Sequence, residues 1–150
     1  MNKLTSTAVT AVLGGAMVVG MATESHAATS IRAKALSTAA ARKNDPYKGG
    51  AAGPNAFDCS GLVYYSYKKH GKTLPRTAQG QYNKATKVTK ANRQIGDLVF
   101  FGGTNSIYHV GIYAGNGKIW NANSTAYRGR KVVLAPISEY GSNVHYARVK

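Results

Sequence analysis

The sequence is poor in cysteine and in acidic residues. Its 150 residues include one cysteine, Cys59, and five aspartates and glutamates against 20 lysines and arginines. One cysteine cannot form a disulfide within the chain, and with scattered histidines it lacks the ligand spacing of a zinc site. We therefore expect no intramolecular disulfide, no metal and no other cofactor.

The sequence also lacks an apolar run long enough for a membrane span. The run from Ala8 to Met21 is interrupted by glycines and is shorter than the roughly 18–20 residues that a span needs. Lys3 before it and Ser25-His26-Ala27 after it are typical of a secretory signal. We expect residues 1–27 to be a signal peptide, with no stable membrane anchor and a secreted, extracellular or cell-wall-associated mature protein.

The shortage of acids leaves a formal charge of +15, so the surface should attract polyanions. Nucleic acid is not expected as a partner, because zinc-finger spacing, an aromatic RNA-binding motif and a basic heptad region are all missing. For an exported protein, an anionic cell-wall polymer or an anionic membrane face is the better candidate. The alternative is that the lysines only form a solvated face.

Cys59 lies where a glycine-rich loop becomes a helix predicted to run to about His70. The unpaired N–H groups of a first helical turn favour a thiolate, and Asp58 is a good N-cap. The Asp58 charge opposes the thiolate, so a nearby imidazole must supply part of the activation. The alternative is that Cys59 is a small buried hydrophobic residue.

The order of the predicted elements indicates an α+β fold, because the helices come first and an antiparallel sheet follows. We expect residues 28–45 to form an N-terminal helix or linker and residues 46–150 to form one catalytic domain. Helices are predicted over residues 29–44, 59–70 and partly 78–85, and strands near residues 87–88, 98–101, 108–113, 118–123, 131–134 and 144–149.

The hairpin around Asn116-Gly117 allows two registers, which place different residues beside His109. A two-residue loop would pair His109 with Ser124 and turn Asn121 to the opposite face. A three-residue loop would pair His109 with Asn123 and Gly111 with Asn121. In that second register both asparagines share the face of the imidazole.

The chain thus offers, in order, the three groups that a cysteine protease needs. Cys59 is the candidate nucleophile at a helix start, and His109 is the candidate base on a strand. Asn121 is the candidate group that orients the imidazole, with Asn123 as its alternative.

Several blocks of the sequence resemble the NlpC/P60 cysteine peptidases, in order from Pro46 to Pro136. The blocks are Pro46-Tyr47, residues 53–63 (GPNAFDCSGLV), 74–77 (LPRT), 96–101 (GDLVFF) and 109–113 (HVGIY). The resemblance implies a papain-like core, in which a helix packs on an antiparallel sheet. It also implies cleavage of peptidoglycan stem peptides, commonly at the bond from γ-D-glutamyl to a diamino acid.

The resemblance gives roles to matching positions. It implies that Cys59 is the nucleophile, that His109 is the base, and that Asn121 fills a third polar position that is often histidine in relatives. It implies substrate binding by Tyr47, Asp58 and Ser60.

Two positions depart from the family pattern, and a third has a simpler explanation than substrate binding. Gly49 stands where relatives usually have tryptophan, and Ala78 where a serine is common. We expect Arg76 to pair with Asp58 rather than with substrate.

The sequence therefore predicts a secreted, monomeric cysteine endopeptidase acting on peptidoglycan. Two alternatives stay open: a non-catalytic wall-binding protein on the same fold, or a wall amidase or acyltransferase that uses the same Cys-His pair.

Overall fold

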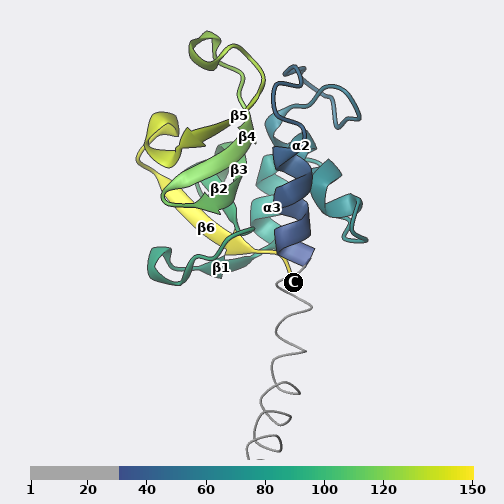
Figure 1. Cartoon of the computed structure of the whole chain (residues 1–150). Helices are drawn as coiled ribbons and strands as arrows, with labels where there is room; N and C mark the ends of the chain where they lie inside the picture. The colour runs from purple at the N-terminus through teal and green to yellow at the C-terminus, as the bar shows by residue number, and fades with distance from the viewer. Residues whose placement is uncertain (1–30) are drawn as a thin grey trace, which may run out of the picture. The chain divides into compact units, whose positions relative to one another are not determined.

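A computed structural model describes residues 31–150 of the chain (Figure 1). The predicted signal peptide lies outside the described residues. Residues 31–40 are helical, and the predicted α+β class is confirmed. The remaining elements are helices α2 (Cys59–Lys68) and α3 (Ala78–Lys84), 3-10 helices η1 (Lys90–Asn92), η2 (Ala126–Arg128) and η3 (Ile137–Tyr140), and strands β1 (Thr86–Val88), β2 (Leu98–Gly103), β3 (Ser106–Gly115), β4 (Lys118–Ala122), β5 (Val132–Pro136) and β6 (Val144–Arg148).

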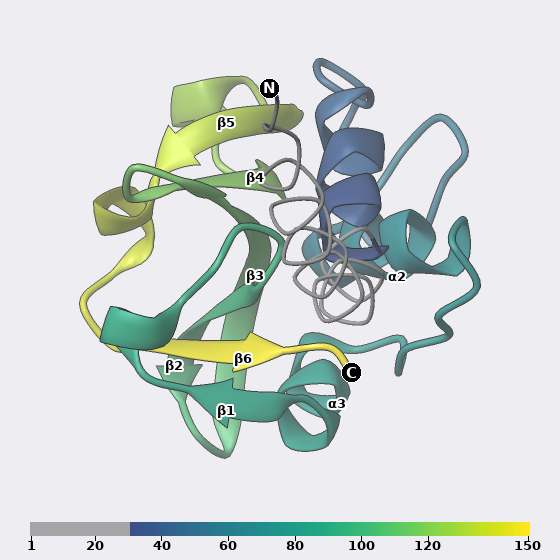
Figure 2. The ribbon, with the colours of Figure 1, turned by 60° about the horizontal axis from the view of Figure 1, so that its bottom comes forward.

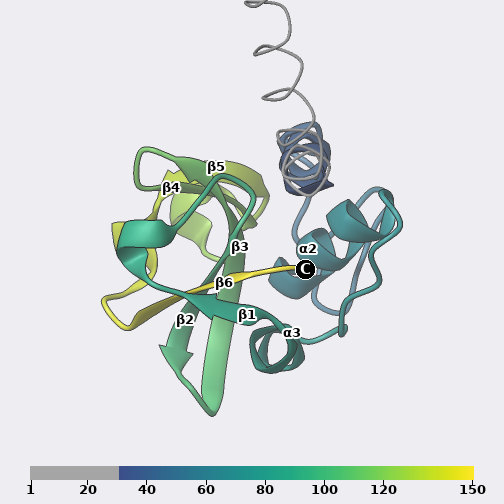
Figure 3. The same ribbon diagram turned by 90° about the horizontal axis from the view of Figure 1, so that it is seen from below.

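The six strands form one antiparallel sheet in the order β1-β6-β2-β3-β4-β5. Figures 2 and 3 show the helix of residues 31–40, α2 and α3 gathered on one side of this sheet. Within residues 31–150, no helix combines the length and apolarity needed to cross a membrane.

Strand β2 is buried on both faces, which explains why its sequence is a continuous apolar run rather than an alternating one. Leu98 and Phe100 join the core beneath the helices. Val99 and Phe101 point the other way, into a second apolar cluster with Ile119, Ile137 and Tyr146. Strand β3, the neighbour of β2 in the sheet, likewise packs against α2 on one face, and its Tyr113 joins the second cluster on the other.

The β3–β4 hairpin combines features of both predicted registers. Its tip is the two-residue turn Asn116-Gly117, both with positive φ, between the paired residues Gly115 and Lys118. A register shift between Tyr113 and Gly115 then changes the pairing, so that Ile112 faces Trp120. Continued by one residue, this register places Asn121 opposite Gly111, as in the three-residue prediction.

Helix α2 begins as predicted at an N-cap aspartate. The Asp58 carboxylate accepts a hydrogen bond from the Gly61 N–H at 2.7 Å. Gly61 lies directly against the preceding loop, because a Cβ added there would be 2.0 Å from the Ala51 carbonyl oxygen. That carbonyl also accepts from the Asp58 N–H at 2.8 Å, so the loop is held on the first turn of the helix.

We expect Gly61→Ala to lower the free energy of unfolding by about 1–3 kcal/mol, because the loop must move away from the added methyl group. Gly49→Ala is the matched control, since a Cβ at Gly49 would have no atom within 4 Å. Urea denaturation of both variants measures the difference. Equal stability of the two would contradict the close docking of the loop on α2.

Candidate active site

Cys59 is the first residue of α2, and its thiol faces strand β3. The backbone N–H groups of Val110, Ser60 and Cys59 itself lie near the sulfur and act to lower the pKa of the thiol. Burial of the thiol raises its pKa and outweighs these donors, and the Asp58 charge adds to the rise. The helix start acts on the thiol as the sequence suggested, but in the free protein the pKa is raised rather than lowered.

His109 lies on β3, immediately before Val110, whose N–H lies near the thiol. The side chain is 7% exposed, and its Nε2 is 3.0 Å from the Asn121 Oδ1. Burial lowers the pKa of His109 to about 4, although the bond with Asn121 acts in the opposite direction. The imidazole is therefore neutral at pH 7.

The orientation of the Asn121 amide determines which ring nitrogen of His109 carries the proton. The Asn121 Nδ2 donates to the Val133 carbonyl at 3.3 Å, so the amide oxygen is the atom that faces the imidazole. That oxygen can only accept, and the hydrogen on the ring must sit on Nε2. The His109 Nδ1 is thus left with a lone pair that can take a proton.

The other asparagine, Asn123, is engaged elsewhere. Its side chain donates to the Thr125 carbonyl at 3.1 Å and accepts from the Thr125 hydroxyl at 3.0 Å. The hydrogen bond to the imidazole comes from Asn121 and not from Asn123.

Tyr140, which the sequence analysis did not single out, packs flat against His109. The two rings are 4.8 Å apart with an interplanar angle of 16°, and Phe101 lies against the imidazole at 5.7 Å. Tyr140 is the last residue of η3, far from His109 along the chain. No sequence pattern links the two residues, because the contact depends on how η3 folds over the sheet.

The remaining candidate residues lie around Asp58. Arg76 donates to both carboxylate oxygens of Asp58, at 3.0 and 2.9 Å, and to the Ser60 hydroxyl at 2.9 Å. The expected Arg76–Asp58 pair is therefore present. Burial alone would raise the pKa of Asp58, but the bonds from Arg76 and from the Gly61 and Gly50 N–H groups hold it below its usual value.

Tyr47 is the candidate substrate residue whose hydroxyl lies near the thiol. Its pKa is raised, first by burial and then by the nearby Cys59 and Asp58. The side-chain oxygens of Asp58 and Ser60 accept hydrogen bonds from Arg76, and Asp58 also accepts from the first turn of α2. By contrast, no hydrogen bond within residues 31–150 engages the Tyr47 hydroxyl.

Comparisons with known proteins find one protein family and relatives that are named as endopeptidases. The sequence model of the NlpC/P60 family matches residues 44–149. The bifunctional muramidase/DL-endopeptidase CwlT of Bacillus subtilis is 49% identical over 87 residues, which cover 55% of this chain and 26% of CwlT. A probable endopeptidase of Corynebacterium glutamicum is 36% identical over 126 residues, covering 83% of this chain and 55% of that protein.

Solved structures agree with the sequence relatives. The P60 domain of the M. avium subspecies paratuberculosis antigen MAP1204 superposes with a TM-score of 0.70 at 27% identity, covering 81% of this chain and 96% of that one. The peptidoglycan hydrolase RipB of Mycobacterium tuberculosis superposes with a TM-score of 0.70 at 29% identity, covering 81% and 65%. The chain spans about a quarter of CwlT and about half of the Corynebacterium relative.

Titration of the His109 ring by NMR should give a pKa of about 4, against 6.5 for an ordinary histidine. Because burial is the cause, Tyr140→Ala should uncover the ring and raise its pKa toward 6.5. Tyr127→Ala is the control, since Tyr127 is 83% exposed. A His109 pKa near 6.5 before any substitution would contradict the burial argument.

Proposed function

Because the chain belongs to the NlpC/P60 family, we propose that it is a cysteine endopeptidase that hydrolyses the stem peptides of peptidoglycan. The observation that carries the proposal is the His109–Asn121 hydrogen bond, which lies on the same strand as the Val110 N–H that acts on the Cys59 thiol. The hydrogen bond to Asn121 leaves Nδ1 of the neutral His109 imidazole as a proton acceptor. The next residue along the strand, Val110, has its N–H near the Cys59 sulfur. Several relatives are named as endopeptidases or peptidoglycan hydrolases, which supports this substrate class.

In the proposed reaction, the Cys59 sulfur attacks the scissile carbonyl carbon while the thiol proton passes to Nδ1 of His109. The resulting oxyanion accepts a hydrogen bond from the Cys59 N–H. The tetrahedral intermediate collapses, the C–N bond breaks, and His109 returns the proton to the leaving amine. Water, deprotonated by His109, then hydrolyses the acyl-enzyme and regenerates the thiol.

The raised pKa of Cys59 and the lowered pKa of His109 fit this sequence of steps. Both groups are neutral before substrate arrives, so the proton moves only when the new C–S bond forms. Charge on the imidazolium is then stabilised by Asn121, whose bond to His109 acts to raise the imidazole pKa.

We propose the bond from γ-D-glutamyl to the diamino acid as the site of cleavage, with Tyr47 next to the substrate and Asp58 and Ser60 shaping the loop through Arg76. CwlT is named a DL-endopeptidase, which supports this bond. We further propose that the protein is secreted, on the basis of the signal-like residues 1–27, and that it works outside the cell as a monomer.

Digestion of purified peptidoglycan, followed by mass spectrometry of the released fragments, tests the reaction. Wild-type protein should release peptides that begin at the diamino acid, and Cys59→Ala should release none. Fragments cut at another amide would favour an amidase. Binding at low salt without release by either protein would favour a non-catalytic wall-binding protein.

Replacement of Asn121 tests how the imidazole is oriented. Asn121→Ala should lower kcat by at least about 10-fold, and by no more than the 10²–10⁴-fold that a positioned base contributes. Asn121→His should keep most of the activity, because a ring nitrogen can accept from Nε2–H. Asn123→Ala is the matched control with little effect on kcat, and activity unchanged in Asn121→Ala would rule out the orienting role.

A further inference from the structure

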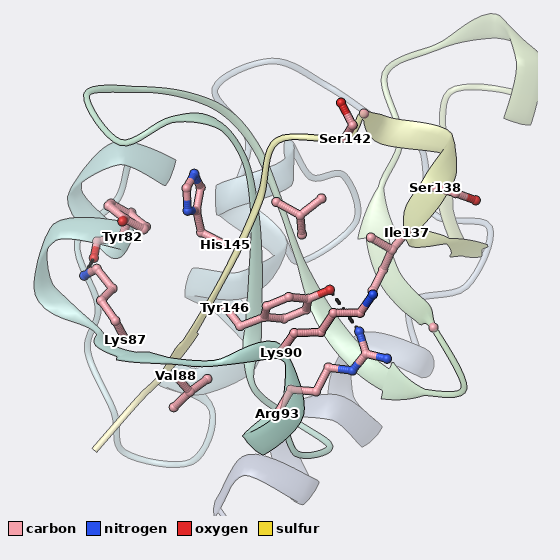
Figure 4. A pocket seen from close by; sticks show the side chains of 13 residues that line it. Tyr82, Lys87, Val88, Lys90, Arg93, Ile137, Ser138, Ser142, His145 and Tyr146 are labelled. Carbon is pink, nitrogen blue, oxygen red and sulfur yellow. Dashed lines mark hydrogen bonds between the residues drawn. The ribbon is translucent and has the colours of Figure 1, made fainter.

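A concave site that does not include the catalytic residues lies over strand β6. This groove, with a volume of about 590 Å³, is lined by β1, η1, η3 and the first half of β6 (Figure 4). Cys59, His109 and Asn121 are not among its lining residues. Nothing in the proposed hydrolysis uses it.

The groove has a strongly basic wall. Lys87, Lys90 and Arg93 come from one short segment, and no acidic side chain lines the groove. Each of the four side-chain carboxylates in residues 31–150 is paired with an arginine: Asp45 with Arg42, Asp58 with Arg76, Asp97 with Arg32 and Arg148, and Glu139 with Arg128. The groove cations therefore have no carboxylate partner in the described part of the chain.

Arg93 is held in place by the groove itself. Its Nη1 donates to the Tyr146 hydroxyl at 2.9 Å, and its guanidinium lies over the Tyr113 and Tyr146 rings at 4.8 and 5.3 Å. Figure 4 shows the guanidinium directed at Tyr146. A guanidinium fixed in this way loses little side-chain freedom on binding, and its remaining N–H groups can bind an oxyanion.

The opposite wall supplies hydroxyl groups. Ser138 and Ser142 are exposed, and in Figure 4 they lie on the other side of the groove from Lys87. On the basic wall, Lys90 is also exposed, and it makes no ion pair within residues 31–150. The two walls together present hydrogen-bond donors at several points along one groove, a pattern that suits a chain of repeating anions better than a single ion.

The aromatic residues of the groove argue against nucleic acid as the ligand. Proteins that bind single strands stack bases on open aromatic faces. The Lys87 Nζ covers the Tyr82 ring at 4.1 Å, and the Arg93 guanidinium covers the Tyr146 ring, which is itself buried. The groove offers charge and hydroxyl groups without a free ring for a base.

We propose that this groove binds a linear, non-aromatic polyanion with repeating phosphate or carboxylate groups, of the kind that an envelope polymer provides. Binding would hold the protein on its polymeric substrate while leaving the catalytic residues open. The proposal does not depend on hydrolysis, because it concerns residues that take no part in the reaction.

The test uses the full chain carrying Cys59→Ala, so that no substrate is cut, with poly(glycerol phosphate) and polyglutamate as probes. At low salt, calorimetry should show binding of at least one probe, and the stronger one identifies phosphate or carboxylate. Lys90→Gln with Arg93→Gln should weaken it roughly 5–30-fold, the effect of losing two charge pairs at the protein surface. Lys34→Gln with Lys43→Gln, which removes the same charge elsewhere, should weaken it less than about 3-fold.

NMR of the protein without groove substitutions provides a second readout that does not depend on variant folding. Amide shifts caused by the probe should concentrate in residues 87–93 and 137–146. Equal weakening in both double variants, or shifts spread over all lysines, would overturn the groove as a site and leave only diffuse charge. Tighter binding of a single-stranded DNA of equal charge would overturn the choice of a non-aromatic polymer.

Discussion

The hydrogen bond between His109 and Asn121 depends on one irregularity in strand β3. Successive residues of a strand point to opposite faces, so a shift of one residue would turn Asn121 away from the imidazole. The register shift between Tyr113 and Gly115 prevents this, because it changes the pairing after the tight Asn116-Gly117 turn. The 3.0 Å contact at His109 is the result. The register of the hairpin thus determines whether His109 has a group to orient its ring.

The second constraint is burial, which favours the neutral form of both reacting groups. It raises the pKa of Cys59 and lowers that of His109, so each group is neutral in the free protein. The stacked Tyr140 supplies part of that burial. The neutral Cys59–His109 pair therefore carries no buried charges in the free protein. Charge develops during the reaction, when the Val110 N–H can stabilise the sulfur and Asn121 can stabilise the imidazolium.

Much of this arrangement could be predicted from the sequence, and the failures have physical reasons. The N-cap at Asp58, the α+β order and the Arg76–Asp58 pair follow from local residue types and spacing. The register shift between Tyr113 and Gly115 could not be predicted, since a two-residue and a three-residue loop fit the same Gly115-Asn116-Gly117 sequence. Tyr140 was missed because its contact is purely tertiary. The sign of the Cys59 pKa shift was missed because burial cannot be judged from a helix start.

The protonation of the His109 ring in the free protein is the most direct test of the proposed catalytic roles. A two-bond ¹H–¹⁵N correlation spectrum at pH 7 distinguishes the two neutral tautomers and the imidazolium. We predict a neutral ring whose proton is on Nε2, where it faces Asn121. Nδ1 should be unprotonated and therefore free to take the thiol proton. A proton on Nδ1, alone or in an imidazolium, would contradict these roles, because the base would then already be occupied before substrate binds.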